Sequence, residues 1–179
     1  MSDAITSARP DLVALASAFT DLNLAPRPLH TGPTCDQLYV RPPADRLLAV
    51  MRFLRDDPAC RYEQLCDLTC IDYLEFPEAD DRYGVIYSLL SLTLGHRLWL
   101  KVFVNDPEPA VDSVTAVWAG AEWLEREVFD LFGVHFNGHP DLRRIVTWDA
   151  FEAHPLRKDY PLRGQGEREN YERVTRDSA

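Results

Sequence analysis

The sequence lacks any run of about 20 apolar residues, the length that a helix needs to cross a bilayer. Its longest apolar stretch, Val85–Leu94, is interrupted by Ser88, Ser91 and Thr93. The start, MSDAITSARPD, has neither a basic region nor an apolar core, so we expect no secretory signal peptide. The sequence therefore predicts a protein of the cytoplasm that reaches a membrane only through its partners.

An excess of positive charge is also absent. The formal net charge is −10 and the isoelectric point is about 4.9. Proteins that bind nucleic acid without regard to sequence need a basic face to neutralise phosphates, so this class is excluded. An anionic membrane surface would likewise repel the chain.

Paired cysteine motifs and glycine-rich phosphate loops are missing as well. The four cysteines do not show the two-residue gaps of zinc or iron–sulfur ligands; they are Cys35, Cys60, Cys66 and Cys70. Disulfides are not expected in a reducing cytosol. We interpret these residues as small apolar side chains that are buried or half-buried.

What the chain does contain is enough apolar material for one domain. It has 179 residues, of which 46% are hydrophobic. A first helix is predicted over Pro10–Asp21, and a second helix begins after Pro42-Pro43. The second helix has an apolar stripe, which consists of Leu47, Val50, Met51 and Leu54.

Strands are indicated by alternating apolar residues. Gln37–Arg41 predicts a short strand, while Arg82–Thr93 and Arg97–Val104 predict a hairpin that turns at Gly95-His96. Tyr62–Leu68 is interpreted as a short helix. Together these elements predict an α+β fold, with an antiparallel or mixed sheet and helices packed on it.

A further helix is predicted over Val114–Phe132, and Gly133 stands where a C-cap belongs. Its apolar stripe consists of Val117, Ala121, Leu124, Val128 and Leu131. Arg126 is expected on the solvated face, paired with Glu122 and Asp130 at four-residue spacing. The carboxylates of Glu125 and Glu127 are expected at the two edges of the apolar stripe. The rings of Trp123 and Phe129 are expected outside the stripe, towards the solvated face of the helix.

After Gly133 the periodicity disappears, which predicts an extended irregular segment. Between Asn137 and Arg163 there are five basic and four acidic side chains, a net charge of +1 that leaves −11 for the rest of the chain. Arg and Trp are enriched at interface anchors, and long irregular segments in compact domains are commonly functional. The segment is therefore interpreted as a binding surface.

Three alternatives remain open. Glu125, Arg126 and Glu127 could form a catalytic set, although no nucleophile or phosphate loop accompanies them. His139 and His154 could ligate a metal in a stand-alone enzyme, but turn histidines that donate to the backbone are more common. The segment could also be a tail that packs on its own domain.

Several motifs resemble the C subunit of proton-pumping NADH:quinone oxidoreductase, the respiratory complex I. They include Glu125-Arg126-Glu127 followed by Asp130 and Leu131-Phe132, and then His139, Arg143 and Ile145-Val146. GHPDLRRI and HPLRKDYPL follow in the same order, and Asp67–Tyr73 is also similar. The resemblance covers residues 35–163. Ala153 departs from it, because the family usually has Gly before this His-Pro.

The resemblance implies a non-redox structural subunit of the peripheral arm, on the cytoplasmic side of the bacterial plasma membrane. It implies the D subunit of that complex as the main partner, with the B and I subunits nearby. FMN, iron–sulfur clusters and quinone are expected in neighbouring subunits, with no cofactor in this chain. Related subunits serve membrane-bound hydrogenases and deazaflavin-linked dehydrogenases, and this sequence separates these complexes poorly.

The resemblance also divides the chain and marks its interface. Residues 1–133 are expected to form the α+β domain, and residues 134–179 a segment that docks on partner subunits. The expected interface or motif residues are Glu125, Arg126, Glu127, Asp130, His139, Pro140, Arg143, Arg144, His154, Pro155, Arg157, Lys158, Asp159 and Tyr160. No catalytic or metal-binding residue is expected.

Overall fold

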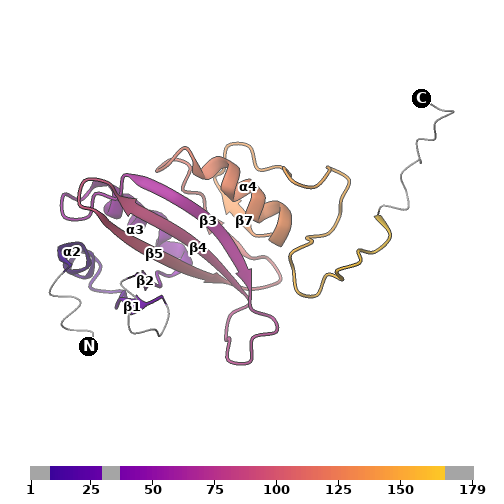
Figure 1. Cartoon of the computed structure of the whole chain (residues 1–179), viewed down its shortest axis with the longest axis horizontal. Helices are drawn as coiled ribbons and strands as arrows, with labels where there is room; N and C mark the ends of the chain where they lie inside the picture. Colours follow the sequence, from indigo (N-terminus) through magenta and orange to yellow (C-terminus); the bar gives the residue numbers. More distant parts are fainter. Residues whose placement is uncertain (1–8, 30–36, 168–179) are drawn as a thin grey trace.

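A five-stranded mixed sheet forms the centre of the computed structural model, which describes residues 9–29 and 37–167 (Figure 1). The strands lie in the order β1-β2-β5-β4-β3, with bounds β1 Arg27–Pro28, β2 Leu38–Val40, β3 Gln64–Asp72, β4 Tyr83–Ser91 and β5 His96–Val104. β2 and β5 are parallel, and all other neighbouring pairs are antiparallel.

Helices pack on this sheet, which confirms the predicted α+β fold. They are α2 Pro10–Ala18, α3 Leu47–Asp56, which follows the short 3-10 turn η1 Ala44–Arg46, and α4 Ala121–Phe132. A second, parallel pair joins β6 Ala110–Asp112 and β7 His135–Asn137. Figure 1 shows α3 behind the sheet and α4 beside β3. None of the helices among the described residues is long and apolar enough to cross a membrane.

The second helix and the hairpin follow their predicted patterns. The four stripe residues of α3 are completely buried, as its 3.6-residue period requires. In β5, alternate residues from Leu98 to Val104 face the core, and the strand pairs with β4 from Tyr83↔Val104 to Ser91↔His96. Cys60 and Cys70 are buried and Cys66 is half-buried, all as free thiols. Cys35 lies outside the described residues.

The helix predicted over Tyr62–Leu68 is wrong, because this region opens the nine-residue strand β3. A β-bulge between Leu65 and Asp67 inserts an extra residue. Leu65 and Leu68 therefore both face the core although they are three residues apart, opposite Leu89 and Tyr87. That spacing resembles a helical repeat, which explains the misreading.

The helix predicted from Val114 begins only at Ala121. Residues 114–120 form turns instead, because the carboxylate of Glu125 reaches back from the helix. It accepts hydrogen bonds from the Ser113 hydroxyl and the Val114 amide, both at 2.7 Å. At the other end, Gly133 caps the helix with a φ of 76°, as predicted.

Candidate functional site

The candidate site is the C-terminal segment, residues 138–167, together with the face of α4 that holds it. No helix or strand is present between residues 138 and 166, which agrees with the predicted loss of periodicity. The short strand β7 was not predicted. In Figure 1 the segment passes α4 and then loops away from the sheet. Its position is fixed by side chains from α4 and from the β3–β4 region.

Asp130 is the main anchor of this segment. Its buried carboxylate accepts hydrogen bonds from the amides of Ile145, Val146 and Thr147 at 2.9, 2.7 and 2.8 Å. The Thr147 hydroxyl also donates to it, and Arg144 forms an ion pair with it at 2.7 Å. One carboxylate thus satisfies three consecutive backbone donors, much as a bound anion would.

These bonds determine the protonation of Asp130. Burial alone would raise the pKa of this carboxyl group. The bonds from the Thr147 hydroxyl and from the amides of Thr147, Ile145 and Val146 outweigh burial and lower the pKa to about 2. Asp130 is therefore ionised at neutral pH, and its charge stabilises the bound conformation of the segment.

Arg126 holds the neighbouring backbone by a different route. Its guanidinium is buried and donates to the carbonyl oxygens of Arg143 and Arg144, at 3.1 and 3.2 Å. It also lies 5.5 Å from the ring centre of Trp123. The predicted solvent-facing Arg126, paired with Glu122 and Asp130, is wrong because these carbonyls draw the side chain under the segment.

A second anchor joins the segment to the sheet. Arg82 binds Asp159 at 2.8 Å and the fully buried Asp72 at 3.3 Å. The Asp72 carboxylate also accepts the Lys158 amide at 2.9 Å. The sequence Lys158-Asp159 is therefore fixed to the ends of β3 and β4, which are far from it in the chain.

Gly133 allows the segment to approach the end of α4. A Cβ atom there would clash with the Arg157 guanidinium and with the His154 ring, which would both have to shift, and the positive φ of this residue also favours glycine. Arg157 donates to the Phe132 carbonyl at 2.6 Å. The C-cap glycine thus serves both the helix end and the packing of the His154–Arg157 turn.

Both predicted turn histidines bind backbone carbonyls, as expected. His154 Nδ1 lies 2.8 Å from the Asp130 carbonyl oxygen, and His139 Nε2 lies 3.1 Å from that of Glu122. The Asp141 amide donates to His139 Nδ1, so the proton of this ring is on Nε2. Burial lowers the pKa of His154. Within residues 9–29 and 37–167, no group of three potential His, Cys, Asp or Glu ligands is placed to hold a metal.

Glu125 does not lie at the edge of the helix stripe as predicted; it is completely buried. Burial raises the pKa of this carboxyl group to about 7, and the bonds from Ser113 and Val114 only partly offset the effect. The Glu125, Arg126 and Glu127 side chains go to the core, to the segment and to the surface, so the structure does not bring them together as a set.

A Glu125→Gln substitution should therefore change how stability depends on pH. The folded-state pKa lies above the usual 4.5, so the wild-type protein loses stability as pH rises from about 4.5 to about 7. Glutamine keeps both hydrogen-bond partners and carries no charge. We expect the stability of the variant relative to wild type to increase by roughly 2 to 3 kcal/mol between pH 4.5 and 8.

Urea unfolding of the two proteins at several pH values gives the difference between their free energies of unfolding. All other titrating groups are the same in both proteins, so their contributions cancel in this difference. A difference that stays constant between pH 4.5 and 8 would show that Glu125 does not titrate in this range.

Large apolar side chains point outward from the segment. They are Val146, Trp148, Leu156 and Leu162, with exposed fractions of 62, 40, 50 and 106%. Trp123 on α4 is 62% exposed, as predicted, whereas Phe129 is half-buried against the core. Val146 is therefore held through its amide by Asp130 while its side chain faces solvent.

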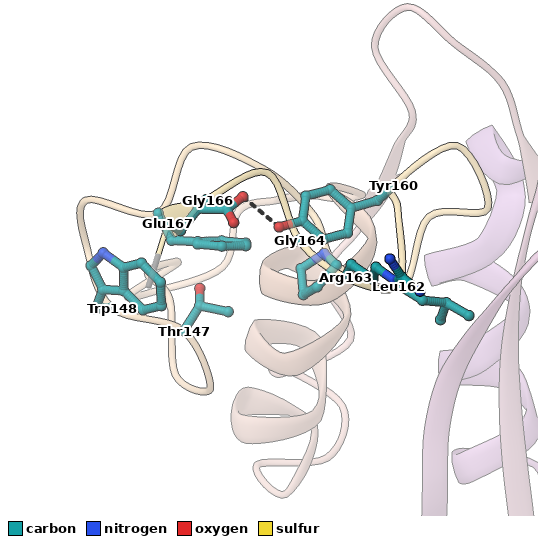
Figure 2. Close-up of a pocket in the computed structure, with 10 residues that line it drawn as sticks. Thr147, Trp148, Tyr160, Leu162, Arg163, Gly164, Gly166 and Glu167 are labelled. Atoms are coloured by element: carbon teal, nitrogen blue, oxygen red, sulfur yellow. Dashed lines mark hydrogen bonds between the residues drawn. The ribbon is translucent and has the colours of Figure 1, made fainter. Parts of the chain in front are cut away.

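A hollow of about 570 Å³ opens within the segment (Figure 2). Its lining includes Thr147, Trp148, Phe151, Tyr160, Leu162 and Arg163. In Figure 2, Trp148 stands at one end and Tyr160 at the other, where the Tyr160 hydroxyl bonds to Glu167. The Phe151 ring lies 4.8 Å from Trp148 and 6.0 Å from Tyr160, which gives the hollow an aromatic floor.

The structure thus divides the predicted interface residues into two groups. Glu125 stands apart, because its buried side chain bonds to Ser113 and Val114. One group joins the segment to its own domain through side chains or backbone atoms: Arg126, Asp130, His139, Arg144, His154, Arg157, Lys158 and Asp159. The other lies nearer the surface: Glu127, Pro140, Arg143, Pro155 and Tyr160.

Sequence reasoning missed Asp72 and Arg82 as anchors and Val146, Leu156 and Leu162 as outward-facing residues. Asp72 lies in the stretch Asp67–Tyr73, which resembles the family. This resemblance could have identified Asp72 as a candidate site residue. Nothing in the sequence around Arg82 indicates its three acidic partners, because they come from distant parts of the chain.

Comparison with known proteins gives consistent matches. Residues 40–166 match the family model described as "Respiratory-chain NADH dehydrogenase, 30 Kd subunit". The C subunit of NADH-quinone oxidoreductase from Caulobacter vibrioides is 44% identical over 164 residues, which are 92% of this chain and 77% of the relative. The corresponding protein of Caulobacter sp. strain K31 is 52% identical over 122 residues, 68% of this chain and 55% of the relative.

A solved structure is also similar. It is the trypsin-resistant fragment (1–134) of Nqo5, at 36% sequence identity and a TM-score of 0.57. The match covers 63% of this chain and 87% of that one. The sequence comparison and the comparison of solved structures therefore agree with each other.

Proposed function

Since the chain belongs to the family of the 30 kDa subunit of respiratory-chain NADH dehydrogenase, we propose that it is a non-redox structural subunit of NADH:quinone oxidoreductase. In this proposal it helps to assemble the peripheral arm of a complex that transfers electrons from NADH to quinone and pumps protons. FMN, iron–sulfur clusters and quinone are bound by neighbouring subunits. The chain is held at the cytoplasmic face of the plasma membrane through the complex.

The proposed docking surface is the outward side of the C-terminal segment, with the D subunit of the complex as the main partner and the B and I subunits nearby. One observation carries this proposal: an irregular segment is fixed from the inside by buried Asp130 and Arg126 while it exposes Val146, Leu156 and Leu162. Fixing a loop before binding reduces the entropy lost on association. Exposed apolar side chains on such a scaffold are typical of a protein interface.

A Leu156→Asp substitution tests this surface. The Leu156 side chain is 50% exposed, so the substitution should leave folding of the chain intact. If a partner covers this residue, a buried unpaired carboxylate should weaken binding by about 3 kcal/mol, a loss of more than about a hundredfold in affinity. We expect the D, B and I subunits to be lost when the tagged variant is purified from membranes.

Leu92→Asp is the matched control. Leu92 is 66% exposed and lies in the turn between β4 and β5, outside the segment. Its substitution should leave co-purification unchanged. Equal recovery of the other subunits with both variants would show that Leu156 is not at the interface.

A further inference from the structure

The loop between β3 and β4 projects from the end of the sheet and exposes apolar side chains. Figure 1 shows it extending past the last residues of both strands. We call residues 73–81 the acidic loop. All residues from 74 to 80 are exposed, and the side chains of Leu74 and Phe76 have exposed fractions of 50 and 62%. A leucine and an aromatic ring on one projection are typical of a contact with another molecule.

The acidic loop is held in one conformation by its own bonds. The Tyr73 amide donates to the Arg82 carbonyl at 2.7 Å and closes the base of the loop. Within the loop, the Phe76 amide donates to the Tyr73 carbonyl at 2.8 Å, and the Ala79 amide donates to the Phe76 carbonyl at 3.2 Å. The rings of Phe76 and Tyr73 meet edge to face, with 5.8 Å between their centres. A loop that is ordered before binding loses less entropy on association.

The acidic loop is continuous with the proposed docking surface, because the residues that flank it also anchor the C-terminal segment. Asp72 accepts the Lys158 amide at 2.9 Å. Arg82 binds the Asp159 carboxylate at 2.8 Å. The exposed side chain of Leu156 lies two residues before Lys158 in the chain. A partner that covers the segment at Leu156 would therefore come close to the loop as well.

The charge of the loop indicates the chemistry of the partner. Residues 73–81 contain no basic side chain and four carboxylates: Glu75, Glu78, Asp80 and Asp81. Two cations of the sheet compensate part of this charge, since Arg41 pairs with Asp81 at 3.9 Å and Lys101 lines the same hollow of about 190 Å³. Four carboxylates against two cations give a net charge of −2. Within residues 9–29 and 37–167, the other three carboxylates form no ion pair.

We propose that the acidic loop docks in a groove of a neighbouring subunit, with an apolar floor for Leu74 and Phe76 and basic side chains at the rim. The inference rests on the proposed function and deepens it, because it adds a second contact to the docking surface and gives the charge of the partner there. Nucleic acid and an anionic membrane would be repelled by the carboxylates. Two copies of this chain that met loop to loop would place like charges opposite each other.

A photoreactive residue in the loop tests the contact. The complex is purified from membranes with p-benzoylphenylalanine in place of Phe76, Leu156 or Leu92, and is then irradiated, digested and analysed by mass spectrometry. We expect the residue at position 76 to link to a different polypeptide of the complex, beside basic side chains. Leu92 is the matched control, because it is 66% exposed in the turn between β4 and β5. The residue at position 92 should form no link.

Position 156 separates a failure of this inference from a failure of the proposed function. A link from position 156 to another subunit, with none from position 76, would show that the chain is embedded while the loop is free, and the inference would be wrong. The absence of links from both positions would contradict the proposed function as well. Links from position 76 only to lipid or to a second copy of this chain would overturn the inference alone.

Charge reversal tests the sign of the partner surface. Glu75 is exposed and lies outside the hollow that Lys101 lines. Asp45→Lys is the matched control for Glu75→Lys, because Asp45 is also exposed and lies in η1, outside the loop. Each variant is co-expressed with the wild-type chain, and its share of the purified complex is compared with its abundance in the cell.

We expect the share of Glu75→Lys to fall roughly tenfold, because its ammonium would face the basic rim of the groove. Asp45→Lys should enter the complex as readily as the wild-type chain. Equal shares of the two variants would show that no basic surface faces the loop, and the inference would be wrong.

Discussion

Asp130→Asn should lower the free energy of unfolding of the chain by about 3 to 5 kcal/mol, the range for breaking a buried charge network. Asparagine keeps the shape of the side chain but has only one acceptor oxygen. Its NH2 group therefore faces either the donating amides of Ile145, Val146 and Thr147 or the Arg144 guanidinium, which is also a donor. It also leaves the Arg144 guanidinium without its carboxylate. Urea unfolding of the full-length chain at pH 7 measures the effect.

The same variant should alter the behaviour in acid. The pKa of Asp130 in the folded protein, about 2, is below the usual 3.8, so its stabilising contribution is present above about pH 4. That contribution is lost as pH falls towards 2, and the asparagine variant should lack this part of the acid unfolding profile. Asp149→Asn, at an exposed position of the same segment, is the control and should change stability by less than about 0.5 kcal/mol. A similarly small effect of Asp130→Asn would mean that the carboxylate does not hold the segment.

Arg144→Ala should destabilise the protein by about 2 to 3 kcal/mol, while Arg143→Ala should cost less than about 0.5 kcal/mol. Arg144 bonds to the Asp130 carboxylate and, at 3.0 Å, to the Thr147 hydroxyl. The Arg143 side chain is 67% exposed, and its one ion pair within the described part of the chain is with the exposed Asp141. Thermal or urea unfolding of the two single variants compares neighbouring residues of identical chemistry.

Because Arg144 and Arg143 have different roles, loss of assembly in a double substitution of both arginines would not by itself show that they contact a partner. Loss of assembly after Arg143→Ala with Arg144→Ala would follow from a loosened segment, because Arg144 faces its own domain. If Arg143→Ala proved the more destabilising of the two single changes, the assignment of Arg144 to the inner side would be contradicted.

Elements with a regular period were predictable from the sequence. The stripe of α3 and the alternation of β5 each place apolar residues at a single spacing, so burial determines their structure. β3 was misread because its bulge shifts the alternation by one residue. The start of α4 was misread because Glu125 pulls the preceding residues into turns. Neither the β-bulge nor the bonds of Glu125 to the preceding residues can be recognised from a local sequence pattern.

The anchoring of the C-terminal segment was not predictable for a different reason. Asp130 and Arg126 are four residues apart on a helix, a spacing that indicates an ion pair. Their actual partners include backbone amides and carbonyls of residues 143–147, and backbone groups are the same in every sequence. Composition and spacing did identify the segment as special, but they could not separate its inner contacts from its outer surface.

Hydrogen exchange on the isolated full-length chain tests most directly the claim that its own domain fixes the C-terminal segment before any partner binds. We expect slow exchange at the amides of Ile145, Val146 and Thr147, which bond to Asp130, and faster exchange in Asp130→Asn. Exchange of these three amides at the rate of an unstructured peptide in the wild-type chain would contradict it.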